Sequence, residues 1–302
     1  MLTGPPGEIR PTGPRVVGLG GGHGLAATLA AARRYARELT AVVSVADDGG
    51  SSGRLRRDLA IPAPGDLRRC LIALASDPSA PWAEAFGLRF DRGDLAGHAL
   101  GNLVIAALVT TTGSFPAAVE EAGRLLGACG RVLPATVEPV VLSATAGNHR
   151  LVGQTAIEEC EGPIDSIGIE PPDCAAPEDV LEAIASADQV VLGPGSLYTS
   201  ILAVAVVPAI REALASRTEG VVFVCNLRAS QETVGYDVAA HVEALGRHGI
   251  VPHIVLADTA EIAVGDVPRP GPRLVTAEMG CPDGWSHDAS RLGLALESLT
   301  RT

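Results

Sequence analysis

Short apolar runs alternate with longer amphipathic segments along most of the chain. The runs are rich in valine and leucine and end beside glycine, asparagine or aspartate, which predicts buried strands. They occupy residues 15–19, 39–45, 189–192, 220–225 and 251–257. Segments of strong helix formers, such as residues 25–36, 67–75 and 237–248, lie between the runs. Strands that alternate with helices favour one doubly wound, mainly parallel, Rossmann-like α/β sheet.

A different pattern occupies the middle of the chain. Residues 131–145 and 151–157 alternate around a turn at 146–149, which predicts an inserted β-hairpin. We therefore expect a Rossmann-like domain over residues 15–260 with an insertion at about 130–170. A flexible tail rich in glycine and proline should precede this domain, and a C-terminal extension should pack on it. The tail covers residues 1–14 and the extension covers residues 261–302.

Two apolar segments predict buried helices. Residues 103–109 are apolar on all sides, as expected for a helix inside the protein. A long apolar helix is expected to follow residue 200. Residues 268–272 contain three prolines and predict a linker.

The composition narrows the class of protein. Of the 302 residues 47% are hydrophobic, which is ample for a core, and the net charge of −12 argues against nucleic acid or an anionic membrane as the main partner. All 23 basic residues are arginine, which excludes Schiff-base chemistry and a lysine-dependent P-loop. The six cysteines have no metal-binding spacing. Because no signal segment or membrane-spanning run is found, we expect a cytoplasmic protein.

The first candidate for chemistry is a glycine loop between the first strand and the first helix. In this arrangement backbone N–H groups and the positive end of a helix face an anion. The ligand-binding candidates are therefore Gly21, Gly22, His23 and Gly24. The spacing does not match G-x-G-x-x-G, which disfavours NAD. The alternative is a turn that only lets helix and strand pack closely.

The second candidate is the polar stretch after the second strand, residues 46–57. Ser51, Ser52 and Arg54 are residues of the types that bind phosphate oxygens. Asp47 and Asp48 could hold a sugar hydroxyl or a Mg²⁺ ion, and they are the catalytic candidates if the protein is an enzyme. A solvated turn with ordinary surface charges is the alternative.

Two further stretches carry polar groups near helix starts. Asp66 is placed to cap the helix over residues 67–75, and Arg68 lies in its first turn, where an anionic ligand would offset the unfavourable helix dipole. His98 and Asn102 are four residues apart at the start of the helix over residues 103–109, so they share one face. A simple capping role for Asp66 and a buried structural role for His98 are the alternatives.

A second glycine loop follows the strand at residues 189–192. Its candidates for a nucleoside or a second phosphate are Gly193, Gly195, Ser196 and Thr199. Asn226 follows the next strand and should lie at the same edge of the sheet. The alternative is that Ser196 only caps the following helix.

Five of these stretches together resemble one family, the gluconeogenesis factor family within the 2-phospho-L-lactate transferase superfamily. They read GGGHGL at residues 20–25, VADDGGSSGRLR at 45–56, PGDLR at 64–68, GHALGNL at 97–103 and LGPGSLYTS at 192–200. The resemblance covers residues 16 to 258, and the run after the second strand fits the gluconeogenesis factors better than the transferases. Where the family usually reads Gln-Pro-Gly-Glu-Thr-Asp-Gly-Tyr, residues 229–236 lack the Pro-Gly pair and carry Val234 in place of an acid.

The resemblance implies a Rossmann-like nucleotide-sugar-binding protein. Its ligand would be UDP-glucose or UDP-N-acetylglucosamine, and it would regulate carbon metabolism, cell shape and peptidoglycan cell-wall synthesis without turnover. Proteins of cell-wall synthesis are then the expected partners, and a homo-oligomer stays open. The alternative is a Mg²⁺-dependent transferase that uses a guanine nucleotide, as the related branch does.

Overall fold

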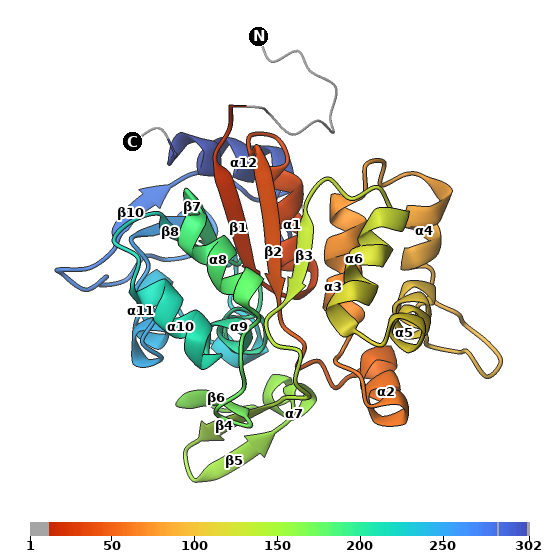
Figure 1. Cartoon of the computed structure of the whole chain (residues 1–302). Helices are drawn as coiled ribbons and strands as arrows, with labels where there is room; N and C mark the ends of the chain where they lie inside the picture. The colour runs from red at the N-terminus through yellow and green to blue at the C-terminus, as the bar shows by residue number, and fades with distance from the viewer. Residues whose placement is uncertain (1–11, 283, 301–302) are drawn as a thin grey trace.

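The computed structural model describes residues 12–282 and 284–300, and within them a sheet of seven parallel strands forms the centre (Figure 1). The order across the sheet is β10-β9-β8-β7-β1-β2-β3. The strands are β1 (Arg15–Gly20), β2 (Glu38–Val43), β3 (Arg131–Pro134), β7 (Gln189–Leu192), β8 (Val221–Val224), β9 (Ile254–Ala257) and β10 (Arg273–Thr276). The doubly wound parallel fold is confirmed. Its strand order reverses between β1 and β7, the switch point where such folds bind ligands.

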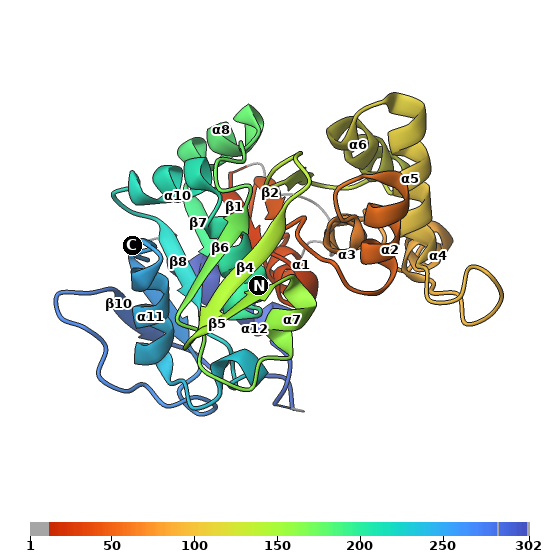
Figure 2. The same ribbon diagram turned by 90° about the horizontal axis from the view of Figure 1, so that it is seen from below.

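Helices cover both faces of this sheet. On one face α1 (Gly22–Ala32) packs against α3 (Gly65–Leu74) and α12 (Ala289–Ser298). On the other face lie α8 (Glu178–Ser186), α9 (Ala203–Ala205) and α10 (Pro208–Ala215) (Figure 1). A group of helices gathers beyond β3 in both views (Figures 1 and 2), namely α2 (Gly50–Leu59), α4 (Pro81–Gly87), α5 (Leu100–Thr112) and α6 (Phe115–Leu125). The helix α11 (Val238–Arg247) connects β8 to β9.

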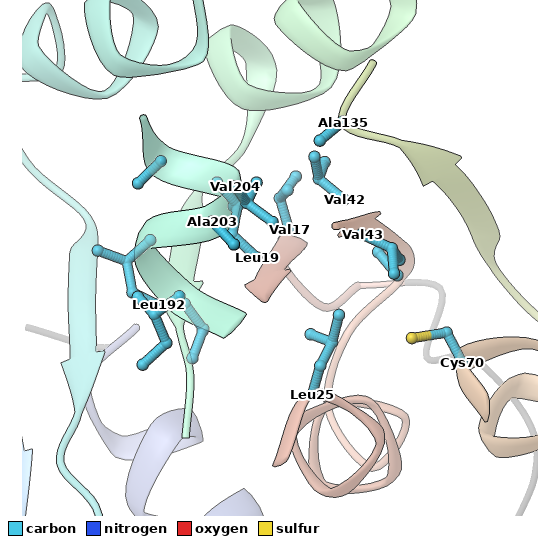
Figure 3. Packing of buried hydrophobic residues seen from close by; sticks show 14 of the residues in the cluster. Val17, Leu19, Leu25, Val42, Val43, Cys70, Ala135, Leu192, Ala203 and Val204 are labelled. Atoms are coloured by element: carbon cyan, nitrogen blue, oxygen red, sulfur yellow. The ribbon is translucent and has the colours of Figure 1, made fainter. Parts of the chain in front are cut away.

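The strands at the switch point are buried on both sides. Side chains of β1 and β2 lie between Leu25 of α1 on one face and Ala203 and Val204 of α9 on the other (Figure 3). Strands covered on both faces need apolar residues at every position, which explains their continuous apolar runs. The rigid core therefore holds the ends of β1 and β7, and the loops that follow them, in fixed positions.

The predicted hairpin is present, with different limits. The strands β4 (Val141–Ala146) and β5 (His149–Val152) form it, and β6 (Ser166–Glu170) adds a third antiparallel strand on the other side of β4. The strand predicted to begin the hairpin at residue 131 is wrong, because β3 is instead the edge strand of the large sheet. The second hairpin strand also ends early, and α7 (Gln154–Glu158) follows it.

Three other expectations need correction. The stretch after β2 is not all loop, because α2 begins at Gly50. The long apolar helix after residue 200 is broken into the π-helix η1 (Leu197–Leu202), α9 and α10, with a bend of 83° before α10. Pro208 begins α10, because proline fits the first turn of a helix but not its interior. The helix α5 is buried along one side only.

The structure describes most of the predicted C-terminal extension but little of the predicted N-terminal tail. The predicted tail falls, up to residue 11, outside the described residues. Within the predicted extension, β10 pairs with β9 and α12 packs against α1. Among residues 12–282 and 284–300, no single helix has the length and hydropathy needed to cross a membrane, although the bent pair at 197–205 and 208–215 meets that test jointly.

Candidate functional site

The two predicted glycine loops meet at the switch point between β1 and β7. A Cβ atom added to Gly24 would lie closer than 3.0 Å to the Pro194 carbonyl oxygen and to Cα of Gly195, so a side chain here would push the loops apart. Thr28 of α1 donates its hydroxyl hydrogen to the Gly193 carbonyl oxygen at 2.6 Å. The loops after β1 and β7 therefore form one continuous surface at the carboxyl ends of the strands.

The first loop leads into a helix end without a side-chain cap of its own. The helix α1 begins at Gly22, and Gly21 before it supplies no capping group. The Asp66 carboxylate lies at this end instead, near enough to the Gly22 amide for the amide to lower the pKa of Asp66. The prediction that Asp66 caps its own helix is wrong, because α3 begins at Gly65 and Asp66 lies in its first turn.

Charges around Asp66 are arranged in a compact group. Arg69 Nη1 donates to Asp66 Oδ1 at 2.6 Å. Burial raises the pKa of Asp66, and this outweighs the opposite effect of Arg69; the nearby Asp47 raises the pKa further. His23 lies at the start of α1, where the partial removal of its ring from water and the charge of Arg69 lower its pKa. The group offers both hydrogen-bond donors and acids beside the first loop.

The neighbouring carboxylates Asp47 and Asp48 engage different partners. Asp47 Oδ1 accepts from the Gly49 amide at 2.9 Å, and Asp47 lies close to Asp66. Asp48 Oδ1 accepts from the amide of Thr155 at 3.1 Å and from its hydroxyl at 2.9 Å. Adjacent side chains on an extended chain point in opposite directions, which explains the divergence. Asp48 therefore ties the polar loop to α7, whereas Asp47 remains beside the glycine loop.

Ser51, His98 and Asn102 come together around the Ser51 hydroxyl. Asn102 Nδ2 donates to Ser51 Oγ at 3.0 Å, and Ser51 Oγ lies 3.1 Å from His98 Nδ1. The amide nitrogen can only donate, so Ser51 Oγ is the acceptor toward Asn102, whereas the direction of its bond with His98 Nδ1 follows the tautomer of the ring. Burial and the nearby Arg54 lower the pKa of His98, which favours the neutral ring. Asn102 Oδ1 is buried without a partner among the described residues.

The two arginine candidates contact backbone carbonyl groups. Arg54 Nη2 donates to the Ala96 carbonyl oxygen at 2.8 Å, so its guanidinium faces the loop before α5. Arg68 is buried and donates to the Phe86 carbonyl oxygen at 3.4 Å, while its Nε has no partner among the described residues. Burial, reinforced by the neighbouring Arg69, lowers the pKa of Arg68 to about 10. Asp66 and Asp47 act in the opposite direction without outweighing burial, and a further anion close to this buried arginine would offset the remaining cost of burying its charge.

The second glycine loop is held by Asn226. The Gly195 amide donates to Asn226 Oδ1 at 3.0 Å, and Asn226 Nδ2 donates back to the Gly195 carbonyl oxygen at 2.8 Å. Both ends of the Asn226 amide are thus occupied by the loop, so its role here is to position Gly195. Thr199 is buried, and its hydroxyl oxygen has no partner among the described residues.

The structure divides the predicted site residues into three neighbouring groups. Gly21, Gly22, His23, Asp47 and Asp66 surround the first loop, and Ser52 lies beside them near Gly65. The second group is Ser51 with His98 and Asn102. The third group is the second glycine loop with Asn226. Within the described residues no set of three or more His, Cys, Asp or Glu side chains is placed to hold a metal ion. The magnesium site predicted at Asp47 and Asp48 has no further support here.

The predicted site leaves out two charged residues next to the loops, although the sequence places Arg69 beside Arg68 in the same helical turn. Arg69 is the ion-pair partner of Asp66, and its signal was the spacing of three residues in the first helical turn after Gly65. Glu232 is buried beside the second loop, behind Ser196. An acid in a short polar turn gives no sign in the sequence that it is buried, so Glu232 could not have been found from the pattern.

Comparison with known proteins identifies the family. The family model described as "2-phospho-L-lactate transferase CofD" matches residues 16–269. The chain belongs to this family. A protein of Mycobacterium tuberculosis named "Putative gluconeogenesis factor" is 39% identical over 318 residues, which cover 94% of this chain and 90% of that protein. The protein of Bacillus subtilis named "Gluconeogenesis factor" is 42% identical over 238 residues, covering 78% of this chain and 75% of that one.

A solved structure extends the CofD-family match to three dimensions. The crystal structure of a Bacillus halodurans protein superposes with a TM-score of 0.88 at 33% identity, covering 94% of this chain and 99% of that chain. The resemblance to the gluconeogenesis factors within this superfamily is thereby confirmed. Because the match spans both glycine loops and the polar stretch after β2, the candidate site belongs to the shared CofD-family fold.

Proposed function

We propose that the chain binds a UDP-sugar, UDP-glucose or UDP-N-acetylglucosamine, at the switch point and regulates carbon metabolism, cell shape and cell-wall synthesis without turnover. The observation that carries this proposal is the meeting of two glycine loops beside one group of polar side chains. A diphosphate needs N–H donors at close range, and glycine loops followed by helices supply them. The link to carbon metabolism is drawn from the name of the Bacillus subtilis relative, whereas the roles in cell shape and cell-wall synthesis are what the resemblance of the sequence motifs implies.

The polar groups around the loops suit a nucleotide sugar. Asp47 beside the first loop can accept hydrogen bonds from sugar hydroxyls, and the unpaired Nε of buried Arg68 favours a nearby anion. The glycine spacing differs from the dinucleotide fingerprint, which disfavours NAD. Proteins of cell-wall synthesis are the partners that this role would require.

A transferase is the second candidate function. The matching family model is named for 2-phospho-L-lactate transferase, and Asp47 lies close to Asp66 beside the first loop. Two neighbouring carboxylates could share a Mg²⁺ ion that a nucleotide phosphate completes. On this alternative the substrate would be a guanine nucleotide.

A panel of ligands tests the proposal. Calorimetry and thermal unfolding would be measured with UDP-N-acetylglucosamine, UDP-glucose, GTP and NAD, each with and without Mg²⁺. We expect both UDP-sugars to bind and to raise the melting temperature by mass action, and NAD to do neither. Binding of GTP alone would favour the transferase, and an equal response to NAD would contradict both candidates.

Substitutions of Asp47 and Asp48 distinguish a binding regulator from a transferase. For a regulator, Asp47→Asn should weaken UDP-sugar binding moderately, with or without Mg²⁺, and no product should form above a control without protein. For a transferase, Mg²⁺ should be essential, and Asp47→Asn should abolish turnover while nucleotide binding persists. Asp48→Asn is the matched control, because Asp48 binds Thr155 rather than the loop surface. Sustained turnover that disappears only in Asp47→Asn would overturn the regulator.

A further inference from the structure

A buried carboxyl group lies beside the second glycine loop and is not explained by the contacts above. Glu232 belongs to the short helix η2 (Gln231–Thr233), and its side chain is only 4% exposed. Both carboxyl oxygens are sealed from solvent and make no hydrogen bond of ordinary geometry among the described residues. Burying an ionised carboxylate without partners is costly, so its state must depend on what surrounds it.

The groups nearest to Glu232 are donors of the second glycine loop. The Ser196 hydroxyl and the backbone amides of Tyr198 and Thr199 are close enough to stabilise the ionised carboxylate, although none reaches ordinary hydrogen-bond geometry. The Thr199 hydroxyl oxygen is also buried without a partner. The loop therefore contains polar groups that its own fold leaves unsatisfied, next to an acid that could engage some of them.

The balance of charges around Glu232 favours the protonated acid. Burial raises its pKa to about 7, and the negative charge of Glu158 acts in the same direction. The elements that pack against η2 are α7 and η1. Glu158 is the only acid of α7, and Tyr198 is the only titratable residue of η1. Burial raises the pKa of Tyr198, so of these three groups Glu232 is the one whose pKa is raised to about 7.

The backbone that carries Glu232 is held in place by its own turn. The Ser230 amide donates to Thr233 Oγ1 at 2.9 Å, and the two hydroxyl oxygens lie 3.0 Å apart. The first of these bonds, together with the bond from the Thr233 amide to the Ser230 side chain, forms a capping box that closes the turn. The proton on Glu232, rather than the position of its backbone, is therefore the variable that the loop can sense.

We propose that Glu232 competes with an anionic ligand for the donors of the second glycine loop, so that the ligand binds when Glu232 is protonated. The inference rests on the proposed function only in taking a diphosphate as that anion. The ionised carboxylate draws the Ser196 hydroxyl and the two amides toward itself and repels a second negative charge in the same buried place. Ligand binding should therefore be accompanied by the uptake of about one proton above pH 7.

The test measures the affinity for UDP-N-acetylglucosamine between pH 6.5 and 8.5. Both phosphates of this ligand are esterified, so the ligand's diphosphate does not titrate in this range. If only the protonated form binds and the pKa is about 7, Kd should rise about 25-fold across the range for the natural protein. For Glu232→Gln the Kd should stay constant across this range. The control Glu159→Gln changes an exposed acid next to Glu158, and its Kd should rise with pH as in the natural protein. Parallel pH profiles for Glu232→Gln and the natural protein would overturn the inference.

A second measurement keeps the inference testable if no UDP-sugar binds. Hydrogen exchange of the Tyr198 and Thr199 amides, corrected for the intrinsic effect of pH, should slow above pH 7 in the natural protein and not in Glu232→Gln. Absence of UDP-sugar binding to every variant would remove the proposed ligand, and the exchange data would then decide the role of Glu232. Equal protection in both proteins at every pH would reject it.

Discussion

The buried Glu232 should make the stability of the protein depend on pH in a defined direction. In the folded protein its pKa is raised to about 7 by burial, whereas an exposed glutamic acid titrates at 4.5. Between these values the folded state keeps a proton that the unfolded state has lost. The stabilisation from this proton is therefore complete below pH 4.5 and is lost as the pH rises through about 7.

The size of the effect follows from the difference between the two pKa values. A difference of about 2.5 units, at about 1.4 kcal/mol per unit, corresponds to about 3 kcal/mol. The side chain is only 4% exposed, so little of this is lost to screening by solvent. In a chain of this length 3 kcal/mol corresponds to a shift of about 5 °C in Tm.

Urea unfolding at pH 5, 6, 7 and 8 would measure this effect. Other groups also titrate, so the informative quantity is the difference in unfolding free energy between Glu232→Gln and the natural protein. We expect the variant to gain about 2.5 kcal/mol relative to the natural protein between pH 5 and pH 8, which is less than the full effect because pH 5 already lies above the unfolded pKa. Glu159→Gln, an exposed change of the same kind, should show no such trend. A constant difference between Glu232→Gln and the natural protein would refute the reasoning, because it would mean that Glu232 titrates as an exposed acid does.

Three further substitutions test the contacts that position the site, each by urea unfolding. Gly24→Ala should lower the free energy of unfolding by about 1–3 kcal/mol, because the new Cβ would press on the second loop. Gly246→Ala in α11, where a Cβ would meet nothing within 4 Å, should raise it by about 0.5–1 kcal/mol. Equal effects of the two changes would contradict the loop contact. Tyr35→Phe leaves the buried Gln189 Oε1 without its donor at 2.6 Å and should cost about 1–3 kcal/mol, so an unchanged stability would show that this bond adds nothing. Leu25→Ala should cost about 2–5 kcal/mol, and a loss below about 1 kcal/mol would be inconsistent with its place in the core.

The parts of the fold that followed from the sequence are those with continuous apolar runs. Five buried strands were predicted, because each is a short apolar run and turn residues mark its ends: β1, β2, β7, β8 and β9. The strand β10 was not predicted, because its four residues are only partly buried and follow a proline-rich stretch. The strand β3 was assigned to the hairpin because alternation alone does not reveal the sheet in which a strand pairs.

The site shows a similar division between what sequence does and does not reveal. Loops at the carboxyl ends of parallel strands must lie at one edge of the sheet, so the meeting of the two glycine loops followed from the strand order. Individual side-chain partners did not follow from it. The link from Asp48 to Thr155 joins positions 107 residues apart, and only the placement of the insertion creates it. Arg54 contacts the Ala96 carbonyl for the same reason, through a loop whose path the sequence does not define.

The two glycine loops differ in how their neighbouring acids are balanced, and this difference gives them separate roles toward one ligand. Asp66 at the first loop forms an ion pair with Arg69, whose Nη1 lies 2.6 Å from Asp66 Oδ1, so a positive charge stands directly beside this acid. Glu232 at the second loop forms no ion pair with an arginine or histidine among the described residues, and only a proton can neutralise it. A diphosphate that spans both loops would meet an acid paired with an arginine at the first loop and an acid whose pKa lies near 7 at the second. The affinity of such a ligand should therefore depend on pH in proportion to how far its charge reaches into the second loop, and ligands confined to the first loop should bind independently of Glu232.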